Sequence, residues 1–275
     1  MGKGHLRKKI QNMIMDDWRF IDTGACGVAY NMALDEAIAT FVRKGISPPT
    51  LRFYGWTTPS VTIGYFQKIK NVDIEYCAQR NISVVRRLTG GRAVLHYDEL
   101  TYSFSAKIGR GFFSKGLFDN YKKIGYALAY ALSAIGLNPE LKLKRKTSGI
   151  RNPLCFQSTS YGEITINNKK IIGSAQKQWE DCLLQQTSIP YSLNKEEICK
   201  VFRFEYGQIL REQMLGLRDI FPELKTDDLK NAIRNSFEEI FGVRFIHASP
   251  SELEISLAKE TEAQRYLSEQ WNFNM

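Results

Sequence analysis

Strand-like alternation in the middle of the chain constrains its fold more than any other feature. The clearest segment covers residues 100–107, where apolar side chains stand at every second position. Similar segments are bounded by turn residues, and we predict strands at residues 50–56, 60–66, 82–87, 92–96, 161–166, 169–175 and 183–189. The strands on either side of Thr57-Thr58-Pro59, and those on either side of Asn167-Asn168, are expected to pair as hairpins.

Helical periodicity surrounds these strands. Residues 31–41 and 118–135 each place their apolar side chains along one stripe, and Asp35 and Glu36 suit the first turn of the first helix. After Pro190 the pattern predicts helices at residues 196–210, 227–241 and 251–267, with Thr226 and Ser249 as N-caps. Strands gathered in the middle, with helices before, between and after them, predict the α+β class rather than a doubly wound sheet.

Length and cysteine content narrow the class of protein. A chain of 275 residues that is 43% hydrophobic can bury a sizeable core, and no apolar run approaches the roughly 18 residues of a membrane span. The basic N-terminus lacks a following apolar region, so we expect a soluble cytoplasmic protein, with a monomer as the default. The five cysteines form no Cys-x-x-Cys pair and only three histidines are present, which argues against a disulfide framework or a metal site.

The chain is basic, with a formal net charge of +9. Such an excess steers acidic partners toward a protein. The charge is spread over a long chain, and only residues 142–146 form a cluster, which is equally well read as a solvated loop. On charge alone, an acidic protein domain would serve as the partner equally well as nucleic acid. Together with the motifs described below, we expect protein partners and no nucleic acid.

A glycine pair between arginines is the most informative motif, within the stretch from Arg86 to His96. Gly90 and Gly91 allow the backbone to approach a ligand closely and to expose its N–H groups, while the flanking guanidiniums attract an anion. A hairpin with basic edges is the alternative interpretation of this stretch alone.

A cysteine and a lysine are spaced in a way that suggests nucleophilic chemistry. Cys155 precedes a predicted strand, and Lys170 follows fifteen positions later, beyond the Asn167-Asn168 turn. A nearby ammonium stabilises a thiolate, which is the nucleophilic form of cysteine. Strand register alone does not bring the two residues together, because a loop must also fold back over the sheet. A buried cysteine and a solvated lysine remain the alternative.

Several motifs in order resemble the biotinyl/lipoyl protein ligase family, over roughly residues 17–272. The matching segments are residues 18–24, 31–37, 51–56, 61–67, 86–96, 170–176 and 266–272. The resemblance implies a mixed, largely antiparallel central β-sheet flanked by helices. The pattern along the chain predicts a flexible basic tail at residues 1–16 and a helical C-terminal extension at 218–275. With the resemblance, residues 17–217 are expected to form an acyltransferase catalytic domain.

Within this family, some members activate free lipoate with ATP, whereas others move an octanoyl group through a cysteine thioester. Leu154-Cys155-Phe156, fifteen residues before the motif lysine, resembles the cysteine type, in lipoate biosynthesis. The resemblance implies that Cys155 and Lys170 are catalytic and face one pocket. The acyl-binding residues that it implies are Arg87, Thr89, Gly90, Gly91, Arg92, Ala93, His96, Gly173, Ser174 and Ala175.

Three features depart from the pattern or complicate it. The family often has His-Asp where this chain has His96-Tyr97, and His-Gly where it has Gln186-Thr187. Another branch carries its nucleophile close to the position of Cys182. We favour Cys155 over Cys182 as the nucleophile.

The resemblance therefore predicts an octanoyltransferase. Octanoyl-acyl carrier protein is the expected donor, and the lysine of a lipoyl domain or of the glycine-cleavage H protein is the expected acceptor. A thioester is already activated, so neither ATP nor a metal is required. One alternative is an ATP-dependent lipoate ligase, in which ATP and Mg²⁺ take part and Arg87 and Lys170 hold the phosphate of an acyl-adenylate. A remote alternative is a non-catalytic module that binds nucleic acid or a partner through its basic surface.

Overall fold

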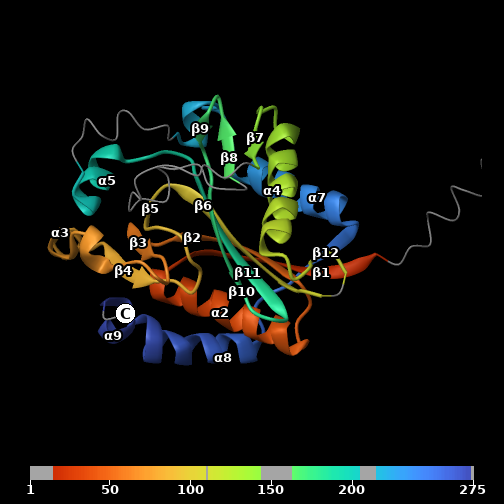
Figure 1. Ribbon diagram of the computed structural model, residues 1–275, viewed down its shortest axis with the longest axis horizontal. Helices are drawn as coiled ribbons and strands as arrows, with labels where there is room; N and C mark the ends of the chain where they lie inside the picture. Colours follow the sequence, from red (N-terminus) through yellow and green to blue (C-terminus); the bar gives the residue numbers. More distant parts are fainter. Residues whose placement is uncertain (1–14, 110, 144–162, 205–214, 274–275) are drawn as a thin grey trace, which may run out of the picture.

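A six-stranded sheet forms the centre of the computed structural model, which describes residues 15–109, 111–143, 163–204 and 215–273. Its strand order is β10-β11-β6-β2-β1-β12 (Figure 1). The first three neighbouring pairs are antiparallel and the last two are parallel, which confirms a mixed, largely antiparallel sheet. The strands are β1 (Asp16–Cys26), β2 (Thr50–Trp56), β6 (Glu99–Lys107), β10 (Gly173–Gln178), β11 (Cys182–Pro190) and β12 (Val243–His247).

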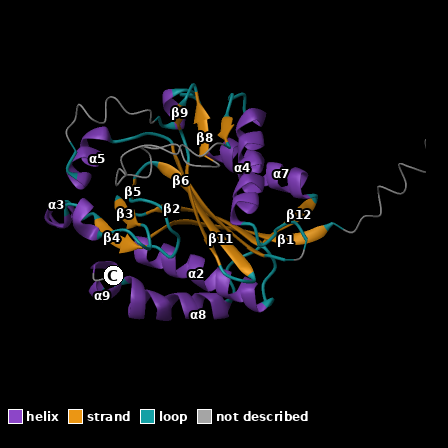
Figure 2. Ribbon diagram, viewed as in Figure 1, coloured by secondary structure: helices purple, strands orange, loops and turns teal. Residues whose placement is uncertain are grey.

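Helices cover both faces of this sheet (Figures 1 and 2). On one face lie α2 (Val28–Lys44) and α8 (Glu252–Thr261), and on the other lie α4 (Leu117–Ala134) and α7 (Thr226–Phe241). The alternation predicted at residues 100–107 separates the two sides of β6. Its apolar residues belong to the core beneath α4 and α7, whereas Ser103 donates a hydrogen bond to Asp35 of α2.

A second sheet, in the order β4-β3-β5, lies beside the first. It consists of β3 (Ser60–Ile63), β4 (Ser83–Arg86) and β5 (Val94–His96), and it packs against α3 (Ile74–Gln79) and α5 (Lys195–Phe202). A short 3₁₀ helix, Ile69–Asn71, precedes α3. The hairpin predicted around Thr57-Thr58-Pro59 is therefore wrong. Both edges of β2 are already occupied by β1 and β6, so β3 pairs with β4 and β5 instead.

A third, small sheet contains β7 (Glu140–Lys142), β8 (Glu163–Ile166) and β9 (Lys169–Lys170). The Asn167-Asn168 turn joins β8 to β9 as predicted, and both asparagines adopt positive φ, 51° and 60°. The strand predicted over residues 169–175 is divided between two sheets. After Lys170 the chain leaves this hairpin, and from Gly173 it pairs with β11 at the edge of the central sheet.

The helix boundaries differ from the predicted ones at several ends. Because α2 begins at Val28, Asp35 lies in mid-helix rather than in the first turn. Thr226 is the first residue of α7 rather than its N-cap, and α8 is capped by Ser251 rather than by Ser249. The helix predicted over residues 196–210 corresponds to α5, which ends earlier, at Phe202. Residues 205–214 lie outside the described part of the chain.

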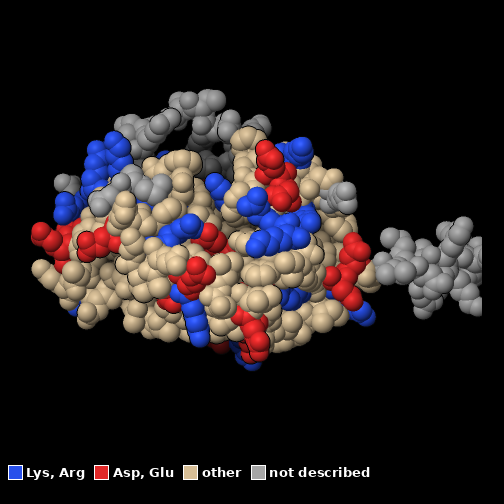
Figure 3. All heavy atoms as spheres, turned by 90° about the horizontal axis from the view of Figure 1, so that it is seen from below, with Lys and Arg blue, Asp and Glu red and all other residues tan. Residues whose placement is uncertain are grey.

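The chain after residue 217 contributes to the sheet as well as to the covering helices. A 3₁₀ helix, Leu217–Asp219, leads toward α7, and β12 pairs with β1 at the sheet edge. Beyond α8 the chain continues as a π-helix, Glu262–Tyr266, and then as α9 (Glu269–Phe273). None of the described helices is long and apolar enough to cross a membrane. On the face shown in Figure 3, acidic and basic side chains are interspersed.

Candidate active site

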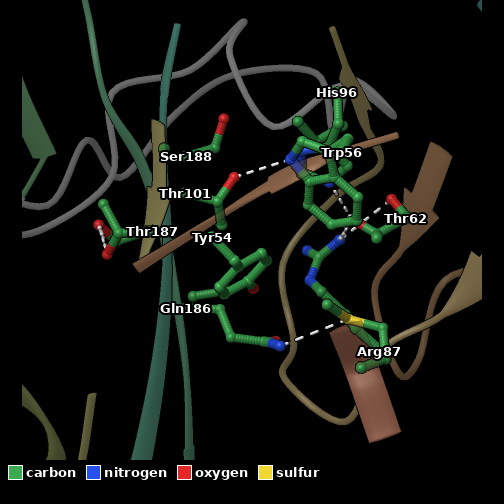
Figure 4. A pocket seen from close by; sticks show the side chains of 14 residues that line it. Tyr54, Trp56, Thr62, Arg87, His96, Thr101, Gln186, Thr187 and Ser188 are labelled. Carbon is green, nitrogen blue, oxygen red and sulfur yellow. Dashed lines mark hydrogen bonds between the residues drawn. The ribbon is translucent and has the colours of Figure 1, made fainter. Parts of the chain in front are cut away.

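A pocket opens on the α2 side of the central sheet, between that sheet and the loop from β4 to β5 (Figure 4). Gln186 of β11 and Arg87 of the loop approach it from opposite sides. Its empty space, counted out into the open solvent at the mouth, is about 350 Å³. Its lining consists of Met32, Tyr54, Trp56, Thr62, Arg87, Val94, His96, Thr101, Gly173, Ser174, Ala175, Gln186, Thr187 and Ser188.

The loop that contains Gly90 and Gly91 packs tightly against Gly64, at the end of β3. A Cβ on Gly64 would lie 2.0 Å from the carbonyl oxygen of Gly91, which leaves no room for a side chain. Gly91 itself has φ of +83°, in the left-handed region that favours glycine. A backbone hydrogen bond from Tyr65 to Thr89 closes the contact at 3.0 Å. The close backbone approach therefore builds one wall of the pocket.

Arg87 stabilises this wall from inside. Its Nε donates to the hydroxyl of Thr89 at 3.0 Å, and its Nη1 donates to the carbonyl and hydroxyl oxygens of Thr62, both at 3.1 Å. Its Nη2 donates to the carbonyl oxygens of Gly90 and Arg92, at 2.7 and 2.8 Å. These five hydrogen bonds use the five N–H groups of the guanidinium. The donors that a ligase would direct at a phosphate are engaged by the loop in this conformation.

Arg86 has a similar role behind the loop. It is fully buried, and burial lowers the pKa of its guanidinium. Its side-chain donors reach only backbone carbonyl oxygens among the contacts of the described residues: those of Gly64, Tyr65, Gln67, Trp271 and Asn272.

His96 is held in the pocket wall by a buried carboxylate that the sequence did not single out. Its Nδ1 lies 2.8 Å from Oε1 of Glu99, its Nε2 lies 2.8 Å from the hydroxyl of Thr62, and its ring stacks on Trp56 at 4.0 Å. Burial raises the pKa of Glu99, but the electrostatic attraction of the neighbouring His96, together with the hydrogen bonds from His96, Thr101 and Ser188, prevails and holds this pKa below the usual value. Glu99 also accepts a hydrogen bond from Ser188 at 2.7 Å. Its position three residues after the motif histidine is the only signal in the sequence.

Asp35 forms a second buried carboxylate centre, beneath the pocket. It is fully buried and pairs with Arg52 at 2.7 Å. Ser103 and the hydroxyl of Tyr54 also donate to it, at 2.6 and 2.9 Å, and so does Nε2 of Gln186 at 2.8 Å. The burial of Tyr54 and its contact with Asp35 raise the pKa of its phenol. The sequence could have indicated this centre, because Asp35 is a charged residue beside the apolar stripe of the helix predicted over residues 31–41.

The pocket brings together five of the predicted site residues: Arg87, His96, Gly173, Ser174 and Ala175. Four others, Thr89, Gly90, Gly91 and Arg92, belong to the loop that forms its wall, and Ala93 is buried in the core beside β3.

Lys170 does not line this pocket. It is 2% exposed on β9, where its ammonium pairs with the carboxylate of Glu163, which is 5% exposed. Cys155 lies outside the described residues, so its predicted role beside Lys170 stays a prediction.

Cys182, the alternative nucleophile, is sealed in the core at the start of β11. Its side chain is fully buried, and its Sγ donates to the carbonyl oxygen of Leu183 at 3.3 Å. Burial raises the pKa of this thiol to about 12. A thiol with such a pKa is protonated at neutral pH and is a poor nucleophile.

Comparisons with known proteins point to one family. The model of the lipoyl protein ligase A/B catalytic domain matches residues 28–238. The octanoyltransferase LipM of Moorella thermoacetica is 35% identical over 271 residues, which cover 94% of this chain and 98% of that protein. The LipM of Clostridioides difficile is 35% identical over 270 residues, with coverage of 94% and 99%.

Two solved structures are similar over nearly the whole chain. Lipoate-protein ligase A bound with ATP has a TM-score of 0.79 and 26% identity, and covers 93% of this chain and 98% of its own. A bi-partite lipoate protein ligase from Thermoplasma acidophilum, described with its E2 lipoyl domain, has a TM-score of 0.78 and 25% identity, with coverage of 94% and 96%.

Proposed function

This chain belongs to the lipoyl protein ligase A/B catalytic domain family, and we propose that it is an octanoyltransferase that modifies a protein lysine. The observation that carries the proposal is the relationship with octanoyltransferases at 31–35% identity over nearly their full length. Lipoate-protein ligases share the fold, but the relatives with the higher sequence identity are transferases.

The pocket supports an acyl substrate because its polar groups bond to one another. Trp56 donates to Glu99 at 3.0 Å, Tyr54 donates to Asp35 at 2.9 Å, and the hydroxyl of Ser188 donates to Glu99 at 2.7 Å. Ring faces, methyl groups and methylene groups are then left to line the cavity. Burying an octanoyl chain against them yields about 0.8 kcal/mol for each methylene.

The reaction that we propose has two steps. The thiolate of Cys155 attacks the carbonyl carbon of an octanoyl thioester on acyl carrier protein, the carrier thiol leaves, and an octanoyl-enzyme thioester forms. The amine of the acceptor lysine, on a lipoyl domain or on the glycine-cleavage H protein, then attacks this thioester. An amide forms and the cysteine thiol is regenerated. Lys170 lowers the pKa of Cys155 and helps to move the proton, and no ATP or metal takes part.

The decisive experiment is to incubate the protein with octanoyl-acyl carrier protein without ATP and to measure its intact mass. We expect one octanoyl adduct on the wild type and on Cys182→Ala, and none on Cys155→Ala. Loss of the adduct in the Cys182→Ala variant alone would contradict our choice of nucleophile.

A second candidate function is ATP-dependent lipoate ligation, favoured by the similarity to lipoate-protein ligase A bound with ATP. It predicts that the acceptor is modified only when free acid, ATP and Mg²⁺ are supplied, and that Cys155→Ala keeps full activity. Running both sets of substrates on the same two variants separates the candidates.

A further inference from the structure

We propose that Gln186 closes the inner end of the pocket and sets the longest acyl chain that the enzyme accepts. The proposal rests on the proposed function and adds a specificity-determining residue to it. It is argued from the strand register, from the hydrogen bonds of the Gln186 amide and from its neighbour Ala175.

The register of four strands arranges the side chains facing α2 in successive rows. One row contains Tyr54, Thr101, Ser188 and Gly173, which are partners across β2, β6, β11 and β10. The next row inward contains Arg52, Ser103, Gln186 and Ala175. Trp56, two positions beyond Tyr54 on β2 and half-buried, marks the mouth. The pocket therefore runs from the mouth toward the second row.

The second row is where the pocket ends. Arg52 and Ser103 are both bonded to Asp35, at 2.7 and 2.6 Å, and neither lines the cavity. Only Gln186 and Ala175 of this row do so. The tail of an acyl chain that fills the pocket meets these two side chains last.

Contacts with helix α2 and with the loop from β4 to β5 fix the amide of Gln186. Its Nε2 donates to Asp35 at 2.8 Å and approaches the sulfur of Met32 at 3.4 Å, while its Oε1 accepts from Thr89 at 2.7 Å. Swinging the side chain aside would remove one of the four hydrogen bonds to the buried Asp35 carboxylate and leave the buried O–H of Thr89 without its acceptor. A longer acyl chain therefore meets a rigid barrier at this point.

Ala175 lies in the same row as Gln186, and a substitution there can shorten the pocket rather than lengthen it. It is the cross-strand partner of Gln186, and it lies 3.5 Å from where a Cβ on Gly91 would stand. A larger side chain at Ala175 fills the inner end from the other side. Gln186 and Ala175 together allow the pocket to be lengthened or shortened.

The test measures octanoyl-enzyme formation, and its hexanoyl, decanoyl and dodecanoyl counterparts, from the matching acyl carrier proteins by intact mass. We expect Gln186→Ala to raise the decanoyl-to-octanoyl rate ratio at least ten-fold. Gln186→Met keeps the volume but loses the hydrogen bonds that fix the side chain, and should raise the ratio less than Gln186→Ala does. Ala175→Leu should raise the hexanoyl-to-octanoyl ratio by a similar factor.

Gln185→Ala is the matched control, because Gln185 precedes Gln186 on β11 and its side chain faces the opposite side of the sheet. It should keep the wild-type chain-length profile. An unchanged profile in both Gln186→Ala and Ala175→Leu would overturn the proposal. If Gln186→Ala does not fold, Ala175→Leu and Gln186→Met decide alone.

The two proposals fail in different ways. A wild-type protein that forms no adduct with any chain length refutes the cysteine mechanism. The binding of free hexanoic to dodecanoic acid, followed by calorimetry, then tests the role of Gln186 without any reaction. We expect the same shift in length preference in Gln186→Ala, and equal preferences in the variant and the wild type would refute it.

Discussion

Two buried carboxylates, Asp35 and Glu99, organise side chains that line the pocket. Asp35 holds Gln186 and Tyr54, and Glu99 holds His96, Trp56 and Ser188. A buried carboxylate is stable only with full hydrogen bonding, so each centre keeps its neighbours in one arrangement. The shape of the pocket is therefore fixed largely by two residues that do not line it.

The Glu99 centre predicts a specific pH dependence. The pKa of Glu99 is held below its usual value, so its ionised form stabilises the fold at neutral pH, and this contribution is lost as the pH falls through the lowered pKa. We expect Glu99→Gln to lower the free energy of unfolding by about 1.5–3 kcal/mol at pH 7, since hydrogen bonds to a charged group are lost. The difference from wild type should shrink as the pH falls below the usual glutamate pKa of about 4.3 and through the lowered one.

Urea denaturation between pH 7 and pH 3 measures this difference. Glu252→Gln, at an exposed position, is the control, and its free energy of unfolding should change with pH in parallel with that of the wild type. A constant gap between Glu99→Gln and the wild type at every pH would show that the ionisation of Glu99 is not involved.

At the scale of elements, the start of α8 gives the sharpest prediction. The hydroxyl of Ser251 accepts a hydrogen bond from the backbone of Glu254 at 3.2 Å, and the Glu254 carboxylate accepts one from the backbone of Ser251 at 2.8 Å. Ser251→Ala removes half of this capping box and should cost about 1 kcal/mol of stability. Ser249→Ala, two residues earlier and exposed, should change little in thermal unfolding. An equal loss of stability in Ser251→Ala and Ser249→Ala would show that Ser251 is not the specific N-cap of α8.

The elements also show what sequence reasoning reached and what it missed. The alternation on β6, the stripe on α4 and the Asn167-Asn168 turn are local signals, and each predicted its element. The hairpin around Thr57-Thr58-Pro59 was wrong because strand pairing depends on which edges distant strands occupy. Asp35 was misplaced because the start of α2 at Val28 has no side-chain cap to mark it.

In the candidate site too, residues with a local sequence motif were predicted, and residues that depend on contacts between distant elements were not. The glycine loop and the Gly173–Ala175 segment were predicted from their motifs and line or enclose one pocket. Glu99 was missed and Asp35 was misread, because their importance depends on partners that come from other strands and helices.

At the scale of the whole molecule, the C-terminal segment fixes one end of the loop from β4 to β5. Asn272 accepts a hydrogen bond from the backbone N–H of Arg86 at 2.9 Å, and its carbonyl oxygen accepts one from the Arg86 guanidinium at 3.1 Å. The indole of Trp271 donates to the carbonyl oxygen of Arg86 at 2.9 Å. Residues 186 positions apart in sequence are thus joined beside the pocket wall.

This anchor predicts that a change near the C-terminus affects acyl transfer. Asn272→Ala leaves the buried N–H of Arg86 without its acceptor, which should lower the free energy of unfolding by about 1–3 kcal/mol. Because Arg86 precedes Arg87, whose contacts build the pocket wall, the variant should also form the octanoyl adduct more slowly at limiting donor. Gln270→Ala, exposed in the same helix α9, should match the wild type in urea denaturation and in the rate of adduct formation. If Asn272→Ala loses stability but keeps the wild-type rate, the anchor supports the fold without shaping the pocket.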